Sequence, residues 1–100
     1  MELIYITCQD REEARKIVNH LLSKKLIVCG NYFEGDSIYS WKGKIEENKE
    51  VILFCKSPGG KFHNIKKEVE KIHSYDVPCI LLLEAEGSEK YTKYAEGELR

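Results

Sequence analysis

The chain has 100 residues, of which 42% are hydrophobic and 33% are charged, and its formal net charge is −1. This length indicates one domain over residues 1–100, and the hydrophobic content suffices for a core, which argues against disorder. The near-neutral charge argues against a nucleic-acid or membrane-binding surface, and no stretch approaches the roughly 18 uninterrupted apolar residues of a membrane span. The N-terminal MELIYITCQD lacks the basic region of a signal peptide, so we expect a cytoplasmic protein.

Residues 2–7 form the first predicted strand, because ELIYIT is rich in β-branched and aromatic side chains. Asp10 and Glu13 then have the spacing of a capping box, which marks a helix N-terminus. Apolar residues recur after them at helical spacing, and this stripe predicts an amphipathic helix over residues 11–24: Ala14, Ile17, Val18, Leu21 and Leu22.

Residues 26–33, LIVCGNYF, predict a second strand. Gly30 interrupts its apolar pattern, and an isolated glycine within a strand is typical of a bulge or a bend. The pair at 35–36, Gly-Asp, predicts a turn that ends this strand.

A further extended run covers residues 37–45, and the polar residues 46–49 are predicted to join it to the strand 51–56, VILFCK. Two extended runs with so short a connection predict a long β-hairpin. The dipeptide at 57–58, Ser-Pro, is predicted to open the second helix, because proline suits the first helical position.

The second helix carries Phe62, Ile65, Val69 and Ile72 on one face. Residues 79–83, CILLL, predict the last strand, and Ser88 is predicted to begin a short terminal helix. The order β-α-β-β-α-β plus a C-terminal helix matches the ferredoxin-like α+β fold, in which two helices cover one face of an antiparallel sheet.

Both of the strands 51–55 and 79–83 are apolar at odd and even positions, so both of their faces require burial. Two helices on one side of a small sheet leave the other side bare. Either the terminal helix or other subunits must cover it, and the surplus of strand in residues 26–56 favours subunits, because free edges invite pairing between chains.

Four cysteines occur at positions 8, 29, 55 and 79, with no C-x-x-C pair, so neither a zinc cage nor a disulfide framework is indicated. Cys8 lies in the strand-to-helix loop where small copper chaperones carry a C-x-x-C pair, but Arg11 stands where the second thiol would be. Cys8 is therefore predicted to be a structural thiol, as small buried cysteines usually are.

Several separated motifs resemble the CutA family, the divalent-cation tolerance proteins. Residues 39–46, YSWKGKIE, resemble the family segment Y-x-W-x-G-K-I-E, and residues 24–31, KKLIVCGN, resemble (E/K)-(R/K)-L-x-A-C-x-N. Residues 73–78, HSYDVP, resemble H-P-Y-(D/E)-x-P, and Tyr91 stands where the family has a tyrosine in its last helix. The resemblance covers almost the whole chain in register.

The resemblance implies a ferredoxin-like homotrimer with a PII-like architecture, and a non-enzymatic binding or regulatory protein linked to tolerance of copper and other divalent metals. No cofactor is required, although weak copper binding is possible, and a further protein partner is not identified. The copper ligands proposed for the family correspond to Ile6, Ile72 and Cys79, so none of their identities is kept.

Two kinds of site are open at this stage. His73 and Cys79 could form a soft-metal site, with Cys8 and Cys29 as further thiols, although a histidine at a helix end more often caps it. Trp41 and Tyr75 could wall a small-molecule site in the cleft between subunits, with Lys44 and Lys56 as contacts to an anionic ligand in a PII-like sensor, although aromatics are also enriched in subunit contacts.

Enzyme activity is not expected. The loop after the first strand carries Gln9 and Asp10 in place of the glycine-rich phosphate loop of an acylphosphatase, and carboxylates there would repel phosphate. The central strands carry aliphatic side chains in place of the exposed aromatics of an RNA-binding ferredoxin-like domain.

Overall fold

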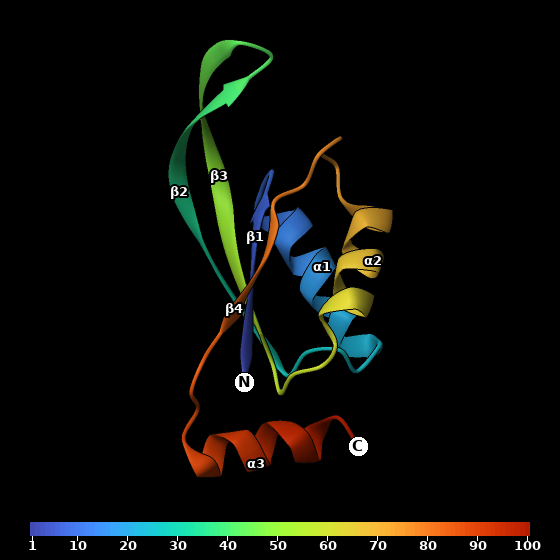
Figure 1. The fold of residues 1–100 in the computed structure, drawn as a ribbon. Coiled ribbons are helices and arrows are strands. Elements are labelled where there is room, and N and C mark those ends of the chain that lie inside the picture. Colours follow the sequence, from blue (N-terminus) through green and yellow to red (C-terminus); the bar gives the residue numbers. More distant parts are fainter.

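The computed structural model describes residues 1–100 as a four-stranded antiparallel sheet with two helices on one face and a third helix across one end (Figure 1). The strand order is β2-β3-β1-β4, which is that of the ferredoxin-like fold, so the predicted fold class is confirmed. The elements are β1 (Glu2–Cys8), α1 (Arg11–Ser23), β2 (Cys29–Trp41), β3 (Lys44–Ser57), α2 (Phe62–Ile72), β4 (Ile80–Glu84) and α3 (Glu89–Glu98).

Strand β1 lies at the centre of the sheet, between β3 and β4. Ile4, Ile6 and Cys8 alternate along it and are completely buried beneath the helices. The core continues onto β3 and into both helices, where the buried side chains include Val51, Leu53, Cys55, Ile17, Leu21, Ile65 and Val69.

Helix α1 begins with the predicted capping residues. The Asp10 carboxylate accepts the backbone N–H of Glu13 at 2.8 Å, and the Glu13 carboxylate accepts the backbone N–H of Gln9 at 2.8 Å. These two bonds satisfy donors that a bare helix N-terminus leaves free. The predicted apolar stripe is confirmed except for Leu22, which is 41% exposed.

The β2–β3 hairpin is longer than the sequence pattern predicts. Strand β2 runs without interruption through Gly35, which pairs with Glu50, so the predicted turn at 35–36 is wrong. The turn is made by Lys42 and Gly43, whose φ angles of 50° and 79° suit the two-residue turn favoured in hairpins. Residues 46–49 are polar because they lie in the exposed, projecting part of the hairpin and not because the chain turns there.

Gly30 is neither a bulge nor a bend, since it pairs regularly with Cys55. A Cβ atom on Gly30 would lie 2.4 Å from Cγ2 of Val18 on helix α1. Glycine is therefore required at this position by the close approach of α1 to the sheet.

Helix α2 begins at Phe62 and not at the predicted Ser57-Pro58. Gly59 and Gly60 have φ angles of 125° and 74°, which break the helical path before it starts. Helix α3 begins as predicted, because the Ser88 hydroxyl accepts the backbone N–H of Tyr91.

The sheet face opposite α1 and α2 is uncovered, since α3 crosses the end of the sheet (Figure 1). Cross-strand register places seven apolar residues on this side, which we name the open face: Leu3, Tyr5, Phe33, Ile52, Phe54, Leu81 and Leu83. The Tyr5 and Phe54 rings are in edge contact at 5.3 Å between centroids, and Phe33 stacks on Phe54 at 6.5 Å. One chain therefore leaves a continuous apolar and partly aromatic surface exposed.

Candidate functional site

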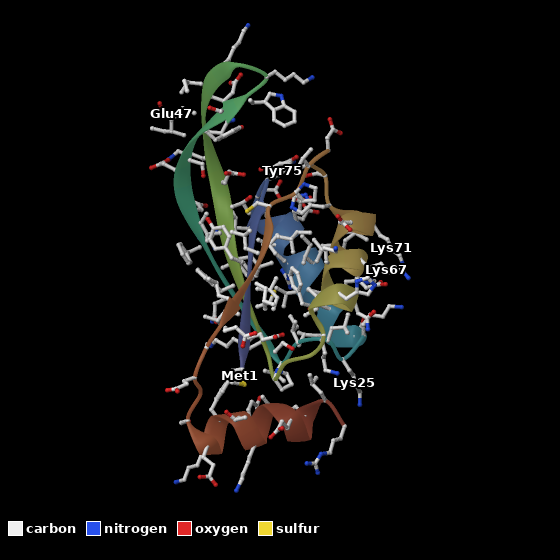
Figure 2. The ribbon with its side chains drawn as sticks, viewed as in Figure 1. Met1, Lys25, Glu47, Lys67, Lys71 and Tyr75 are labelled. Carbon is white, nitrogen blue, oxygen red and sulfur yellow. The ribbon has the colours of Figure 1, made fainter.

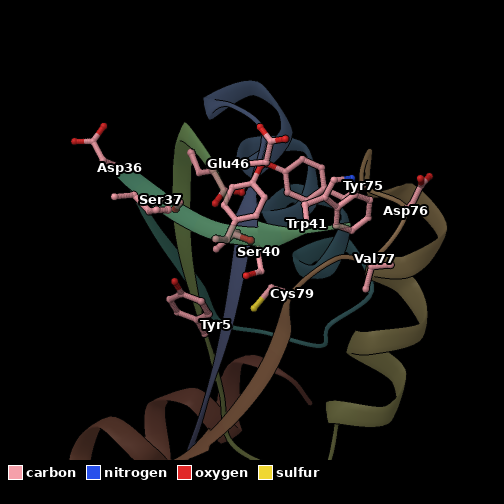
Figure 3. A pocket seen from close by; sticks show the side chains of 14 residues that line it. Tyr5, Asp36, Ser37, Ser40, Trp41, Glu46, Tyr75, Asp76, Val77 and Cys79 are labelled. Atoms are coloured by element: carbon pink, nitrogen blue, oxygen red, sulfur yellow. The ribbon is translucent and has the colours of Figure 1, made fainter. Parts of the chain in front are cut away.

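A hollow of about 690 Å³ lies on the open-face side of the hairpin, where the projecting strands approach the loop between α2 and β4 (Figure 3). Its volume falls in the range of small-molecule sites. We name it the hairpin hollow, and its lining residues are Tyr5, Thr7, Asp36, Ser37, Ile38, Tyr39, Ser40, Trp41, Glu46, Glu50, Tyr75, Asp76, Val77 and Cys79.

Four aromatic side chains from three segments wall the hairpin hollow: Tyr5 from β1, Tyr39 and Trp41 from β2, and Tyr75 from the α2–β4 loop. Tyr39 and Trp41 share one face of β2 because side chains alternate along a strand. The Tyr39 hydroxyl accepts an N–H of the Asn48 amide at 2.6 Å, which holds the ring across the two strands.

Glu50 lines the hairpin hollow and is only 9% exposed. Its Oε2 atom accepts the hydroxyl of Tyr75 at 2.7 Å. Burial raises the pKa of Tyr75, and the hydrogen bond to the Glu50 carboxylate raises it further, because the neutral phenol is the form that donates. Tyr75 therefore stays protonated and ties the loop to β3.

The α2–β4 loop is held at its other end by three hydrogen bonds. The His73 ring donates from Nε2 to the Thr7 carbonyl at 2.8 Å and accepts the Tyr75 backbone N–H on Nδ1 at 3.1 Å. The Ser74 backbone N–H donates to the Glu13 carboxylate at 2.8 Å. The loop that carries Tyr75 is thus fixed to both β1 and α1.

Cys8, Glu13 and His73 place one potential metal-ligand atom each within 4.8 Å of one another. Two of the three already use their ligand atoms within the chain, because both His73 nitrogens and both Glu13 oxygens are hydrogen-bonded. Burial, followed by the nearby Glu13 charge, raises the pKa of Cys8 to about 12, so the thiol is protonated near neutral pH. A metal ion requires the thiolate, and these residues do not fit a preformed metal centre.

The predicted site residues divide into three groups. Trp41, Tyr75 and Cys79 line the hairpin hollow together. Lys44 and Lys56 do not line it, and they lie near opposite ends of β3, roughly 40 Å apart along an extended strand. The Lys56 ammonium instead lies 5.8 Å from the centre of the Tyr91 ring. A single chain therefore does not gather the predicted anion contacts, and a cleft completed by a second subunit stays a prediction.

His73 clusters with Cys8 and Glu13, whereas Cys79 lines the hairpin hollow, so the metal site of His73 with Cys79 stays a prediction. Two of the three positions of the proposed family copper ligands are unsuited to a metal. Ile6 is completely buried in the core, and Ile72 packs against it. Sequence reasoning missed Glu50, for which the only signal was an acidic residue immediately before a strongly apolar strand.

Comparison with known proteins shows the family to which the chain is similar. The profile of the CutA1 divalent ion tolerance protein family matches residues 2–98. A divalent-cation tolerance protein CutA from Pyrococcus horikoshii is 38% identical over 95 residues, covering 94% of this chain and 93% of that protein. One from Thermococcus kodakarensis is 44% identical over 78 residues, covering 78% and 75%.

Solved structures agree. The structure of a periplasmic divalent cation tolerance protein CutA from Archaeoglobus fulgidus superposes on this chain with a TM-score of 0.96 at 35% identity, over 100% of both chains. A PII-like protein CutA from Nostoc shares the fold, with a TM-score of 0.90 at 24% identity, over 100% of this chain and 98% of that one. The chain belongs to the CutA1 divalent ion tolerance protein family. None of its three helices combines the length and hydrophobicity required to cross a bilayer.

Proposed function

We propose that this chain acts as a homotrimer whose subunits cover one another's open faces. The observation that carries the proposal is the open face itself, on which Phe33 is 51% exposed, Leu81 52% and Leu83 46%. A contiguous apolar surface of this kind is typical of a subunit interface and is costly in water. The chain's hairpin adds free backbone edges that pair readily between copies.

The function that we propose for the trimer is a non-catalytic one in the response to divalent cations, copper among them. Family membership supports this role, and the protonated state of the buried thiols Cys8 and Cys55 supports binding or regulation over covalent chemistry. We expect the metal response not to need a tightly bound ion, and we expect the protein in the cytoplasm, where its four free thiols stay reduced. A further protein partner is compatible with this role.

A growth experiment tests the function. A bacterial strain without its own member of this family is transformed with the wild type or with Leu81→Lys, which places a charge on the open face, and is grown on rising copper concentrations. We expect the wild type to restore tolerance and Leu81→Lys to fail. Equal growth with the two plasmids, or no restoration by the wild type, contradicts the proposal.

Calorimetric titration of the purified protein with Cu²⁺ and Zn²⁺ tests whether the metal response needs a tight site. We expect only weak heats, and the same heats after the accessible thiols are blocked. Tight binding with a fixed stoichiometry that is lost on thiol blocking would show that the protein is a direct metal binder.

A second candidate function is sensing of a small molecule, and the hairpin hollow with its aromatic walls is the observation that favours it. The sequence suggested an anionic ligand through Lys44 and Lys56. Four carboxylates and no cationic side chain line the hollow, so electrostatics within one chain disfavour an anion. Thermal-shift measurements against a metabolite panel test the sensor function, which a uniformly flat response contradicts.

A further inference from the structure

The hairpin hollow carries an excess of negative charge that the chain does not neutralise. Its carboxylates are Asp36, Glu46, Glu50 and Asp76, and no lysine, arginine or histidine lines it. Asp36 forms an exposed ion pair with Lys49 at 3.4 Å, but no ion pair involves the other three. The electrostatic potential of the hollow therefore favours a cation.

Glu50 is the residue of the hollow that most favours a cation. It is more than nine-tenths buried, and its only hydrogen bond in the chain is the one from the Tyr75 hydroxyl to Oε2. Its Oε1 atom accepts no hydrogen bond from the chain and keeps some solvent exposure. A largely buried carboxylate without a counter-ion loses part of its hydration, and a cation that reached Oε1 through the hollow would offset this cost. Burial, then the nearby Cys79 and Glu50, raise the pKa of Tyr5, and burial, then Glu50, raise the pKa of Cys79, so both neighbours are protonated and neutral.

The walls of the hollow suit an organic cation. The rings of Tyr5, Trp41 and Tyr75 bound it (Figure 3), and Tyr39 also lines it. Aromatic faces attract ammonium groups through their quadrupoles. The Trp41 ring already attracts one cation of the chain, since the Lys42 ammonium lies 5.6 Å from its centre.

The arrangement suits an extended cation better than a metal ion. A divalent metal needs several ligand atoms that converge on one point. The only such group in the chain is Cys8, Glu13 and His73, so the four carboxylates of the hollow do not converge. Spaced carboxylates and a volume of about 690 Å³ match a flexible chain with several charged groups.

We propose that the hairpin hollow binds an organic cation with two or more amino groups, each ammonium pairing with a carboxylate while the alkyl segments lie against the aromatic walls. This rests on the small-molecule sensing function proposed above and specifies its ligand class. Glu50 is the central anchor, and Glu46 and Asp76 hold the outer ammonium groups.

The fluorescence of Trp41 tests the proposal directly, because it is the only tryptophan in the chain. Spermidine is the probe, and citrate at equal ionic strength is the anionic comparison. We expect spermidine to change the Trp41 emission with saturation and citrate to leave it unchanged. Added NaCl should weaken spermidine binding, since exposed charge pairs are screened.

Matched variants locate the binding. We expect Glu50→Gln, which can still accept the Tyr75 hydroxyl, to weaken spermidine binding by about tenfold, and Glu46→Gln to weaken it by several fold. Glu47→Gln is the control, because Glu47 lies on the same strand (Figure 2) but does not line the hollow. Circular dichroism and light scattering on each variant show that fold and assembly are kept.

The outcomes separate this inference from the sensing function. A saturable response to citrate and not to spermidine would keep the hollow as a sensor site but overturn the cation. A Trp41 signal that spermidine leaves unchanged would overturn the inference, whereas the sensing function is decided by the metabolite panel. A neighbouring copy filling the hollow would overturn both. Spermidine binding that Glu50→Gln and Glu47→Gln affect equally would also overturn the inference.

Discussion

Glu13 joins two segments that are far apart in the sequence. Its carboxylate receives the backbone N–H of Gln9 on one oxygen and that of Ser74 on the other, both at 2.8 Å. It therefore caps α1 and fixes the loop that carries Tyr75 into the hairpin hollow. Burial of the carboxylate acts to raise its pKa, but the hydrogen bonds from Gln9 and Ser74 outweigh this effect, and the pKa of Glu13 is lowered.

This lowered pKa predicts a pH dependence of stability. The stabilisation from Glu13 is complete above the ordinary value of 4.5 and is lost as the pH falls through the lower pKa of the folded state. We expect Glu13→Gln to reduce the free energy of unfolding by about 2 kcal/mol at pH 7, because the amide cannot accept both N–H groups.

Urea unfolding at pH 7 and at acidic pH, at one protein concentration, measures this effect. The difference between wild type and Glu13→Gln should shrink as the pH falls. Glu12→Gln is the control, since Glu12 is exposed and makes no hydrogen bond. A difference that is the same at both pH values would contradict the assignment.

The reactivity of the buried thiols Cys8 and Cys55 gives a second prediction at the scale of single residues. Burial is the first cause that raises the pKa of Cys8 and of Cys55 to about 12. We expect both to resist a disulfide reagent in the native protein near pH 8 and to react on unfolding, because the thiolate is the reactive form. Mass spectrometry of the labelled sites checks this, and rapid native labelling of Cys8 would contradict its structural role.

At the scale of elements, the sequence predicted which segments are helices and strands better than it predicted where they turn. The capping residues and the apolar stripe of α1 are local signals, and they were read correctly. The hairpin turn was misplaced because Gly35-Asp36 and the polar residues 46–49 are turn-like in composition, although they lie in the exposed arms of an extended ribbon. The true turn depends on Lys42 taking a positive φ, which its side chain does not signal.

Gly30 is a second position whose role the local sequence does not reveal. Glycine is required there because of Val18, which is twelve positions away in the sequence and on another element. We expect Gly30→Ala to lower the free energy of unfolding by about 1–3 kcal/mol, because a Cβ atom would overlap Cγ2 of Val18. Denaturant unfolding measures the change.

A matched pair of variants makes this prediction specific. Adding Val18→Ala to Gly30→Ala should recover part of the loss, since it removes the overlapping methyl groups. Gly97→Ala on α3 should be neutral or slightly stabilising, because no atom lies within 4 Å of its added Cβ. A double variant whose loss is the sum of its single variants would contradict the proposed overlap.

For the candidate site, the sequence identified its aromatic residues but not its charge. Trp41 and Tyr75 stood out by residue type, and the structure brings them together. The carboxylates could not be identified as site residues from the sequence, because the register of the hairpin is what makes Glu46 and Glu50 face the hollow. Lys44 and Lys56 seemed suitable as anion contacts only while the length of β3 was unknown.

At the scale of the whole molecule, the two sides of the sheet are unequal. One side is covered by α1 and α2 and is fully buried at its centre, whereas the open face is bare in a single chain (Figure 1). The account therefore depends on an assembly that closes over Tyr5, Phe54 and their neighbours.

A charged substitution on the open face should dissociate this assembly. We expect Leu81→Lys to shift the protein toward smaller species, because a lysine in an apolar interface cannot keep its hydration. Leu22→Lys is the control, since Leu22 is similarly exposed, at 41%, but lies on helix α1. Sedimentation velocity checks the pair, and equal behaviour of the two variants would contradict the open face as the interface.

The most direct measurement is the mass of the wild-type particle by light scattering at micromolar concentration. The account predicts a stable particle of three times the chain mass of 11.6 kDa. A monodisperse particle of 11.6 kDa would contradict it, because the open face would then be stable in water without a partner.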